Sequence, residues 1–110
     1  MTDPIADVTT SIHETGVHVR VTGELDMSNA GTVGDRIRAA GTSTPVDLDL
    51  SDIEFLDSSA LHMLQQLSAA FDRDGGRLTV AVAPGSIVER LLTITHMDAY
   101  LNIRESQPGT

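Results

Sequence analysis

The chain has 110 residues, enough for one domain with its own core, and it contains no cysteine. The absence of cysteine excludes disulfides, thiolate metal sites and cysteine nucleophiles. Seven basic against sixteen acidic side chains give a formal charge of −9, which repels a nucleic-acid backbone. The chain starts with neither a basic nor an apolar segment, and no apolar run approaches the roughly 18 residues of a membrane span. We therefore expect a cytoplasmic protein that contacts neither nucleic acid nor membrane directly.

The first half of the chain predicts two strands and a helix. The strands are joined by a short turn, and the second has valine at alternate positions, so one of its faces should be buried. Apolar side chains then recur at helical spacing, between polar caps and a glycine stop. The limits we expect are residues 6–13 and 17–22 for the strands, and residues 27–40 for the helix, capped by Asp26 or Ser28 and ended by Gly41.

The second half continues the alternation of strands and helices. A strand in which Val and Leu alternate with Asp leads into a short acidic loop, and an apolar helical pattern follows that loop. A nearly continuous apolar run then predicts a strand that is covered on both faces. The expected strands are residues 46–50, 77–82 and an edge strand over 100–104, and the expected helices cover about 58–73 and 85–94.

Strands that alternate with helices imply right-handed crossovers between neighbouring strands. The sequence therefore predicts an α/β fold, in which helices pack against a mixed sheet of four to five strands. No internal repeat, linker or low-complexity tract divides the chain. We expect a single domain over residues 1–110, with its core between residues 6 and 104.

Asp57-Ser58-Ser59 lies directly before the second predicted helix. The first N–H groups of a helix have no partner within the helix and carry partial positive charge, so a hydroxyl there can hold a phosphate. Capping by Asp57 or Ser58 would explain one of these polar residues, because both types are preferred N-caps. It leaves the second serine unexplained, which makes Ser59 a candidate for reversible phosphorylation.

Other chemistry is less compatible with the sequence. Asp57, Ser59 and His62 are close together, but a catalytic triad needs the imidazole between hydroxyl and carboxylate in a pocket with an oxyanion hole. The four histidines show no paired metal spacing, and the acidic residues of 47–54 lack calcium-loop spacing, which predicts a solvated edge. We predict no catalytic residue, no metal and no cofactor.

Several motifs occur in an order that is typical of one known family. They are Gly23-Glu24-Leu25-Asp26, the strand, loop and helix of residues 46–64 with Phe55-Leu56-Asp57-Ser58-Ser59, Gly75-Gly76-Arg77-Leu78, and the segment that begins at Pro84-Gly85. In these motifs the chain resembles the STAS domain, the family of bacterial anti-sigma factor antagonists. The resemblance runs from about residue 6 to residue 104 and implies a STAS-like fold.

The resemblance implies a partner-switching role. An antagonist of this family binds, when unphosphorylated, an anti-sigma factor that is also a serine kinase with a GHKL-type ATPase fold, and so releases a sigma factor. Phosphorylation of the second serine of the motif, Ser59 here, separates the two proteins, and a phosphatase resets the cycle. The implied partner-binding residues are Gly23, Glu24, Asp26, Asp57, Ser58, Ala60 and His62.

Two positions depart from the family pattern. Ala60 stands where glycine is usual and His62 where a small residue is usual, which predicts a bulkier surface beside Ser59. Residues three apart share a helix face, so His62 is also expected to pair with a phosphate on Ser59. The alternative function is a non-phosphorylated sensor or scaffold module that binds a small ligand or a partner protein, and an apolar cavity with convergent polar groups would favour it.

Overall fold

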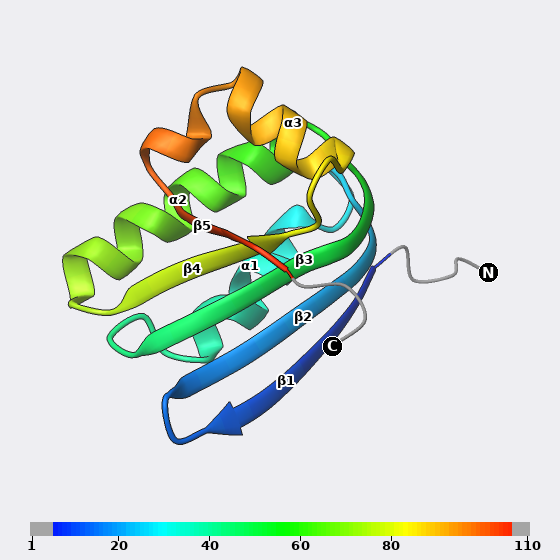
Figure 1. Cartoon of the computed structure of the whole chain (residues 1–110). Helices are drawn as coiled ribbons and strands as arrows, with labels where there is room; N and C mark the ends of the chain where they lie inside the picture. The colour runs from blue at the N-terminus through cyan, green and yellow to red at the C-terminus, as the bar shows by residue number, and fades with distance from the viewer. Residues whose placement is uncertain (1–5, 107–110) are drawn as a thin grey trace.

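The computed structural model describes residues 6–106, which contain a five-stranded sheet in the order β1-β2-β3-β4-β5 (Figure 1). β1 and β2 form an antiparallel hairpin, whereas each later neighbouring pair is parallel. The predicted fold class, a mixed sheet with helices packed against it, is confirmed. The strands are β1 (Ala6–His13), β2 (Gly16–Leu25), β3 (Pro45–Leu56), β4 (Arg77–Val82) and β5 (Asn102–Glu105).

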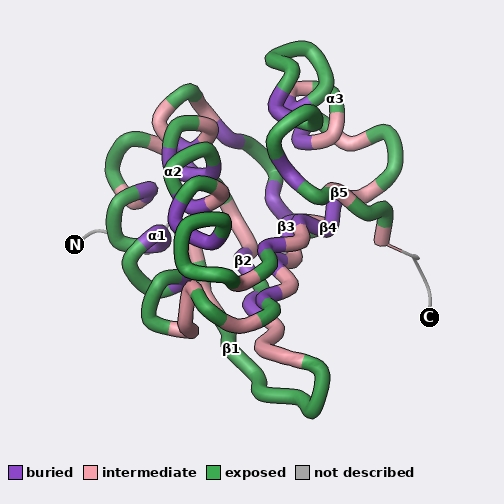
Figure 2. Tube along the Cα trace, turned by 90° about the vertical axis from the view of Figure 1, so that its left-hand side faces the viewer, coloured by how far each residue is buried: buried purple, intermediate pink, exposed green. Residues whose placement is uncertain are grey.

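The helices connect the parallel strands. Helices α1 and α2 lie together on one side of the sheet, and α3 packs beside β3 (Figures 1 and 2). A single apolar cluster joins all three helices to the sheet, and residues 6–106 contain no buried polar or charged side chain. No helix within this part of the chain is both long and apolar enough to cross a membrane. The helices are α1 (Ala30–Ala39), α2 (Ser58–Asp74) and α3 (Ile87–Ile94), with a 3₁₀ turn at Met97–Ala99.

Two strands are longer than the sequence predicts. β2 continues through Gly23 to Leu25, and β3 continues through the acidic segment that we expected to be a loop. Both extensions depend on irregular pairing: the β2–β3 register shifts between Arg20 and Thr22 and again between Gly23 and Glu24. Gly23 has φ of 99°, which an L side chain rarely adopts. Such irregularities interrupt the strict alternation of apolar and polar residues from which a strand is predicted.

The start of α1 also differs from the prediction. Neither Asp26 nor Ser28 is the N-cap, since the helix begins after Asn29. Met27 was expected on the apolar face of this helix, but it lies in the preceding loop with 82% of its surface exposed. The side chains of Asp26 and Asn29 form hydrogen bonds within the loop, and the first helical turn begins only at Ala30.

Close backbone contacts hold the end of the sheet at which the parallel strands β2, β3 and β4 begin. A Cβ atom on Gly76 would lie 2.3 Å from the carbonyl oxygen of Thr42, and one on Gly16 would lie 2.4 Å from that of Pro45. The hydroxyl of Thr42 also donates a 2.5 Å hydrogen bond to the carboxylate of Asp74 at the end of α2. We call this region the amino end of the sheet.

Candidate functional site

Asp57 connects two segments at the opposite end, which we call the carboxyl end of the sheet. It is the N-cap of α2, and its Oδ1 accepts hydrogen bonds from the N–H groups of Ser59 (2.9 Å) and Ala60 (3.2 Å). Its Oδ2 accepts a third from the N–H of Met27 (3.1 Å), and its own N–H donates to the carbonyl of Leu25 (3.1 Å). One carboxylate therefore fixes the loop between β2 and α1 to the start of α2.

The loop between β2 and α1 is braced by its own side chains. The amide of Asn29 donates to the carbonyl of Glu24 and accepts from the N–H of Asp26, both at 2.9 Å. The Asp26 carboxylate in turn accepts from the N–H of Ser28 at 2.9 Å and from its hydroxyl at 2.5 Å. These bonds hold the loop in a defined shape that presents Met27 to solvent.

A groove of about 420 Å³ lies between α1 and α2 and opens to solvent. Its α1 wall has little side-chain cover, because Gly31 and Gly34 lie along it. A Cβ atom on Gly34 would lie 3.0 Å from Cγ of Met63, so the absence of a side chain there allows the two helices to approach closely. The groove is lined by Met27, Ala30, Gly31, Gly34, Arg38, Ser58, Ser59, His62, Met63 and Gln66.

The structure brings most of the predicted site residues together at the carboxyl end. Ser58 is exposed and Ser59 half-buried, and both line the groove together with the exposed His62. Ser59 donates its backbone N–H to the Asp57 carboxylate. Among residues 6–106, neither the Ser58 hydroxyl nor the Ser59 hydroxyl has a hydrogen-bond partner. Gly23, Glu24 and Asp26 lie in the adjoining end of β2 and its loop.

Two expectations about this site are wrong. Ala60 has 0% of its surface exposed and packs in the core, so its methyl group adds no bulk beside Ser59. The N–H groups of Ser59 and Ala60 were expected to be available to a phosphate, but the Asp57 carboxylate already accepts from both. Of the two substitutions relative to the family pattern, His62 alone changes the accessible surface.

Several residues that shape the site cannot be identified from motifs in the sequence. The spacing of Met27 predicts the apolar face of the first helix, and no motif points to Asn29, Gly31, Gly34 or Arg38. The two glycines carried a detectable signal, because glycine weakens a helix interior by about 1 kcal/mol relative to alanine and is kept there for packing or function. The exposure of Met27 had no such signal, since its spacing fits the apolar face of α1.

The geometry does not support a hydrolase. Ser59 and His62 line the same groove, but both oxygens of Asp57 accept backbone N–H groups, so this carboxylate is not placed to orient the imidazole. In the described part of the chain, no group of three or more His, Asp or Glu side chains is arranged to hold a metal ion.

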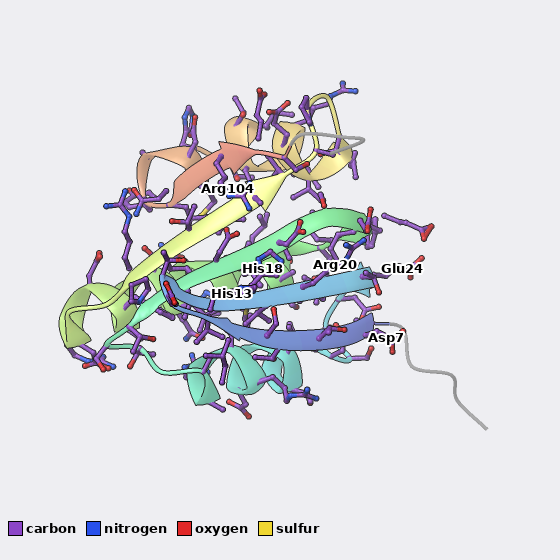
Figure 3. The ribbon with its side chains drawn as sticks, turned by 60° about the horizontal axis from the view of Figure 1, so that its bottom comes forward. Asp7, His13, His18, Arg20, Glu24 and Arg104 are labelled. Carbon is purple, nitrogen blue, oxygen red and sulfur yellow. The ribbon has the colours of Figure 1, made fainter. Side chains whose placement is uncertain are left out.

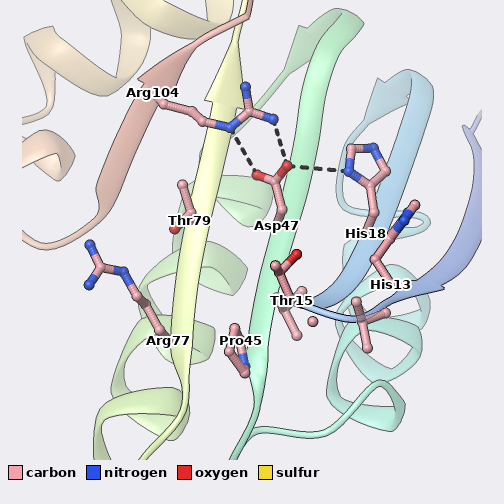
Figure 4. A pocket seen from close by; sticks show the side chains of 11 residues that line it. His13, Thr15, His18, Pro45, Asp47, Arg77, Thr79 and Arg104 are labelled. Atoms are coloured by element: carbon pink, nitrogen blue, oxygen red, sulfur yellow. Dashed lines mark hydrogen bonds and ion pairs between the residues drawn. The ribbon is translucent and has the colours of Figure 1, made fainter.

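A second cluster of polar side chains covers the sheet face that carries no helix (Figure 3). Asp47 on β3 accepts hydrogen bonds from Arg104 on β5 at 2.5 and 3.2 Å, and lies 3.2 Å from Nδ1 of His18 on β2 (Figure 4). Asp52 pairs with Arg20 in the same way across β2 and β3. Asp47 and Asp52 therefore belong to cross-strand ion pairs, which the expectation of a solvated edge did not include, whereas Asp52 and Glu54 are exposed as that expectation requires.

The Asp49 carboxylate, on the same face of β3, is held in its charged form. Burial opposes the ionisation of Asp49, but hydrogen bonds from the hydroxyl (2.6 Å) and N–H (2.9 Å) of Ser51 outweigh it, so the pKa of Asp49 is lowered. The hydrogen bonds to Asp47 raise the pKa of Arg104. This face therefore carries matched charges and contributes to holding the strands together.

Comparison with known proteins identifies the family. The model of the STAS domain matches residues 4–107, so the chain belongs to the STAS domain family. No curated protein matches the chain closely enough to be reported as a relative. Solved structures of the same fold include an anti-sigma factor antagonist from Mycobacterium paratuberculosis, which is 24% identical with a TM-score of 0.78 and covers 94% of this chain and 89% of its own.

Two further structures of this fold show one protein in two states. The anti-sigma factor antagonist SpoIIAA in its unphosphorylated form is 15% identical, with a TM-score of 0.73 and coverage of 93% of this chain and 90% of its own. The Bacillus protein SpoIIAA in its phosphorylated form is 16% identical, with a TM-score of 0.69 and coverage of 93% of both chains. At these identities the likeness concerns the fold.

Proposed function

We propose that this chain is an anti-sigma factor antagonist, which binds an anti-sigma factor kinase while unphosphorylated and is released when Ser59 is phosphorylated. The observation that carries the proposal is the position of the Ser59 hydroxyl, without a hydrogen-bond partner among residues 6–106, on the groove between α1 and α2. Family membership and the antagonists among the structures of this fold support it. In this role the chain is a cytoplasmic binding module that acts on transcription through another protein.

The surface around Ser59 has the features of a protein-binding site. Met27 projects from a braced loop with 82% of its surface exposed, and a flexible apolar side chain suits contact with a partner. The adjacent groove offers a hollow that the partner can fill, and the carboxylates of Asp26 and Asp57 bond to the loop that carries Met27 at its edge. An apolar centre with a polar rim is the usual arrangement of such interfaces.

Phosphorylation would act here through local charge. A phosphate adds about −1.5 to −2 charges at neutral pH. The first N–H groups of α2 are already bonded to Asp57, so the phosphate would gain no bonds from them and would remain near the Asp26 and Asp57 carboxylates. Its charge would therefore be presented to the partner, and binding would weaken without a change of fold.

The alternative function, a module that senses a small ligand, predicts an apolar cavity with convergent polar groups. The groove between α1 and α2 is open to solvent and lined by exposed residues at its Ser58 end. It suits a macromolecular surface better than an enclosed ligand. A scaffold role without phosphorylation is tested by the experiments that follow.

The first experiment tests the modification. The purified chain is incubated with Mg-ATP and a GHKL-type anti-sigma factor kinase from the same genome, and the product is analysed by intact and tandem mass spectrometry. We expect one phosphate on Ser59, none on the Ser59→Ala variant and unchanged labelling of Ser58→Ala. Phosphate on Ser58, or none with a kinase shown to be active on another substrate, would contradict the assignment.

The second experiment tests the interface by calorimetric titration with the same kinase. Ser59→Asp should weaken binding by about tenfold or more, because it adds charge at the contact. Ser43→Asp is the matched control: it adds the same charge to an exposed position at the amino end of the sheet and should leave the affinity unchanged. Equal affinity of both variants would place the interface elsewhere.

A further inference from the structure

Within residues 6–106, no strand pairs with the outer edge of β1. β1 is an outer strand of the sheet order, it pairs with β2 without any bulge, and it is exposed along most of its length (Figure 2). Its last six residues, 8–13, contain no proline and no acidic or arginine side chain, and Ile12 has 84% of its surface exposed. Edge strands are usually blocked by charges, proline or bulges, because open backbone groups invite another strand.

The opposite edge of the sheet shows the usual protection. β5 has four residues, and two of them, Arg104 and Glu105, are charged. A short charged strand offers little backbone for pairing with another chain. β1 therefore lacks the protection that β5 has against pairing with another strand.

The β1–β2 register determines which backbone groups of β1 point outward. His13 is paired with Gly16 across a two-residue turn, and the residues that flank such a turn form a hydrogen-bonded pair. Hydrogen-bonded and non-hydrogen-bonded pairs alternate in an antiparallel ladder. The N–H and C=O groups of Val8, Thr10 and Ile12 therefore point away from β2 and are available to another strand.

We propose that β1 pairs with β1 of a second copy of this chain, antiparallel and centred on Thr10. In this register Thr10 faces Thr10, and Val8 faces Ile12 of the second copy, so the outward backbone groups of both strands bond to one another. The exposed Ile12 gains an apolar neighbour, and cross-strand pairs of this kind are stabilising. Asp7 faces His13 of the second copy on each side of the two-fold axis, where the carboxylate can accept a hydrogen bond from the imidazole.

Neighbouring registers satisfy the side chains less well. Centring the pair on Thr9 places Asp7 opposite Ser11 and Ile12 opposite the small side chain of Ala6. Centring it on Ser11 places the apolar Val8 opposite Glu14. The register centred on Thr10 therefore matches both the apolar and the charged residues of the strand. Figure 3 shows Asp7 and His13 at the two ends of β1, as this pairing requires.

The first test measures the dimer and its dependence on Ile12 by sedimentation equilibrium. Ile12→Lys should weaken the dimer about tenfold or more, because it replaces the apolar pair with an unpaired charge. Ile94→Lys is the matched control, since Ile94 on α3 is also exposed, at 67%, and this variant should dimerise normally. A chain that stays monomeric up to millimolar concentration, or an equal effect of both variants, would overturn the proposal.

The second test examines the register itself. In a mixture of differently labelled copies, we expect intermolecular nuclear Overhauser effects between the methyl groups of Val8 and Ile12. His13→Asp should weaken the dimer by placing two acids opposite each other, and the exchange of both residues, Asp7→His with His13→Asp, should restore it. A dimer without the Val8–Ile12 contacts, or one that the double exchange does not restore, would contradict this register.

Discussion

The two ends of the sheet are built by different means. At the amino end, Gly16 and Gly76 lie so close to the carbonyl groups of Pro45 and Thr42 that no side chain fits between them. At the carboxyl end, side chains hold the loops in place, with the Asp57 carboxylate as the central acceptor. Close backbone contacts thus dominate at the amino end, beside one side-chain bond from Thr42 to Asp74, whereas side-chain bonds dominate at the carboxyl end, beside one backbone bond from Asp57 to Leu25.

This difference separates the closely packed end of the sheet from the end that carries the candidate site. Close backbone packing tolerates almost no change in shape, whereas a capping residue contributes about 1 kcal/mol and can be altered without loss of the fold. The exposed Met27 and the serine hydroxyls are found at the carboxyl end. The following predictions test this comparison, beginning with the largest expected effect.

Gly76→Ala should destabilise the chain by about 3 kcal/mol, because the added Cβ would overlap with the carbonyl oxygen of Thr42. Urea unfolding monitored by circular dichroism measures the change. Gly31→Ala is the control, since a Cβ there would meet nothing within 4 Å, and this variant should be neutral or more stable. Equal stability of the two variants would show that the amino end is not tightly packed.

Asp57→Ala should cost about 1–2 kcal/mol, because α2 loses its cap and the loop loses its connection to α2. The exchange rate of the Met27 amide proton should rise in the same variant. Asp57→Asn keeps a side-chain acceptor and should lose less stability. A Met27 amide that remains equally protected in Asp57→Ala would show that the connection does not hold the loop.

Ser51→Ala, midway between the two ends, should cost about 1 kcal/mol at neutral pH, because Asp49 loses a charge-stabilising hydrogen bond. The lowered pKa of Asp49 provides stability above the unfolded-state value of 3.8, and this stability disappears as the pH falls through the folded-state pKa. The difference between wild type and variant should therefore shrink below pH 3.8. Ser43→Ala is the control, and a difference that is independent of pH would contradict the role of Asp49.

Ser59→Ala should change stability by less than about 0.5 kcal/mol, because its hydroxyl has no partner among residues 6–106. Thermal unfolding compares it with Ser58→Ala, for which we expect the same small effect. A loss similar to that of Asp57→Ala would mean that Ser59 supports the fold, and the comparison of the two ends would then fail.

The sequence predicted the order of the elements because regular periodicity survives along most of the chain. β4 and α2 have continuous apolar patterns, and their limits were predicted to within a residue. β2 and β3 were predicted too short, because bulges near Gly23 and Ser51 interrupt the alternation. Local patterns describe a strand, but they do not describe a shift in its pairing with a neighbour.

The site was predicted in part for a related reason. Asp57 and Ser59 belong to a contiguous motif, so their position before α2 could be inferred from sequence alone. The contact of Asp57 with Met27 spans 30 positions, and the approach of Gly34 to Met63 depends on how two helices pack. Such contacts are properties of the tertiary structure, and a periodic pattern contains no information about them.

The close approach of Gly34 to Met63 has a consequence for the rates of binding. Because the two walls of the groove share the core, they are in place before a partner arrives, and little ordering should slow association. A partner would meet a preformed surface on a chain with a formal charge of −9. Extra charge at the rim of such a surface mainly changes the association rate and its dependence on salt. A phosphate on Ser59 would therefore change the rate at which the partner associates as well as the stability of the complex.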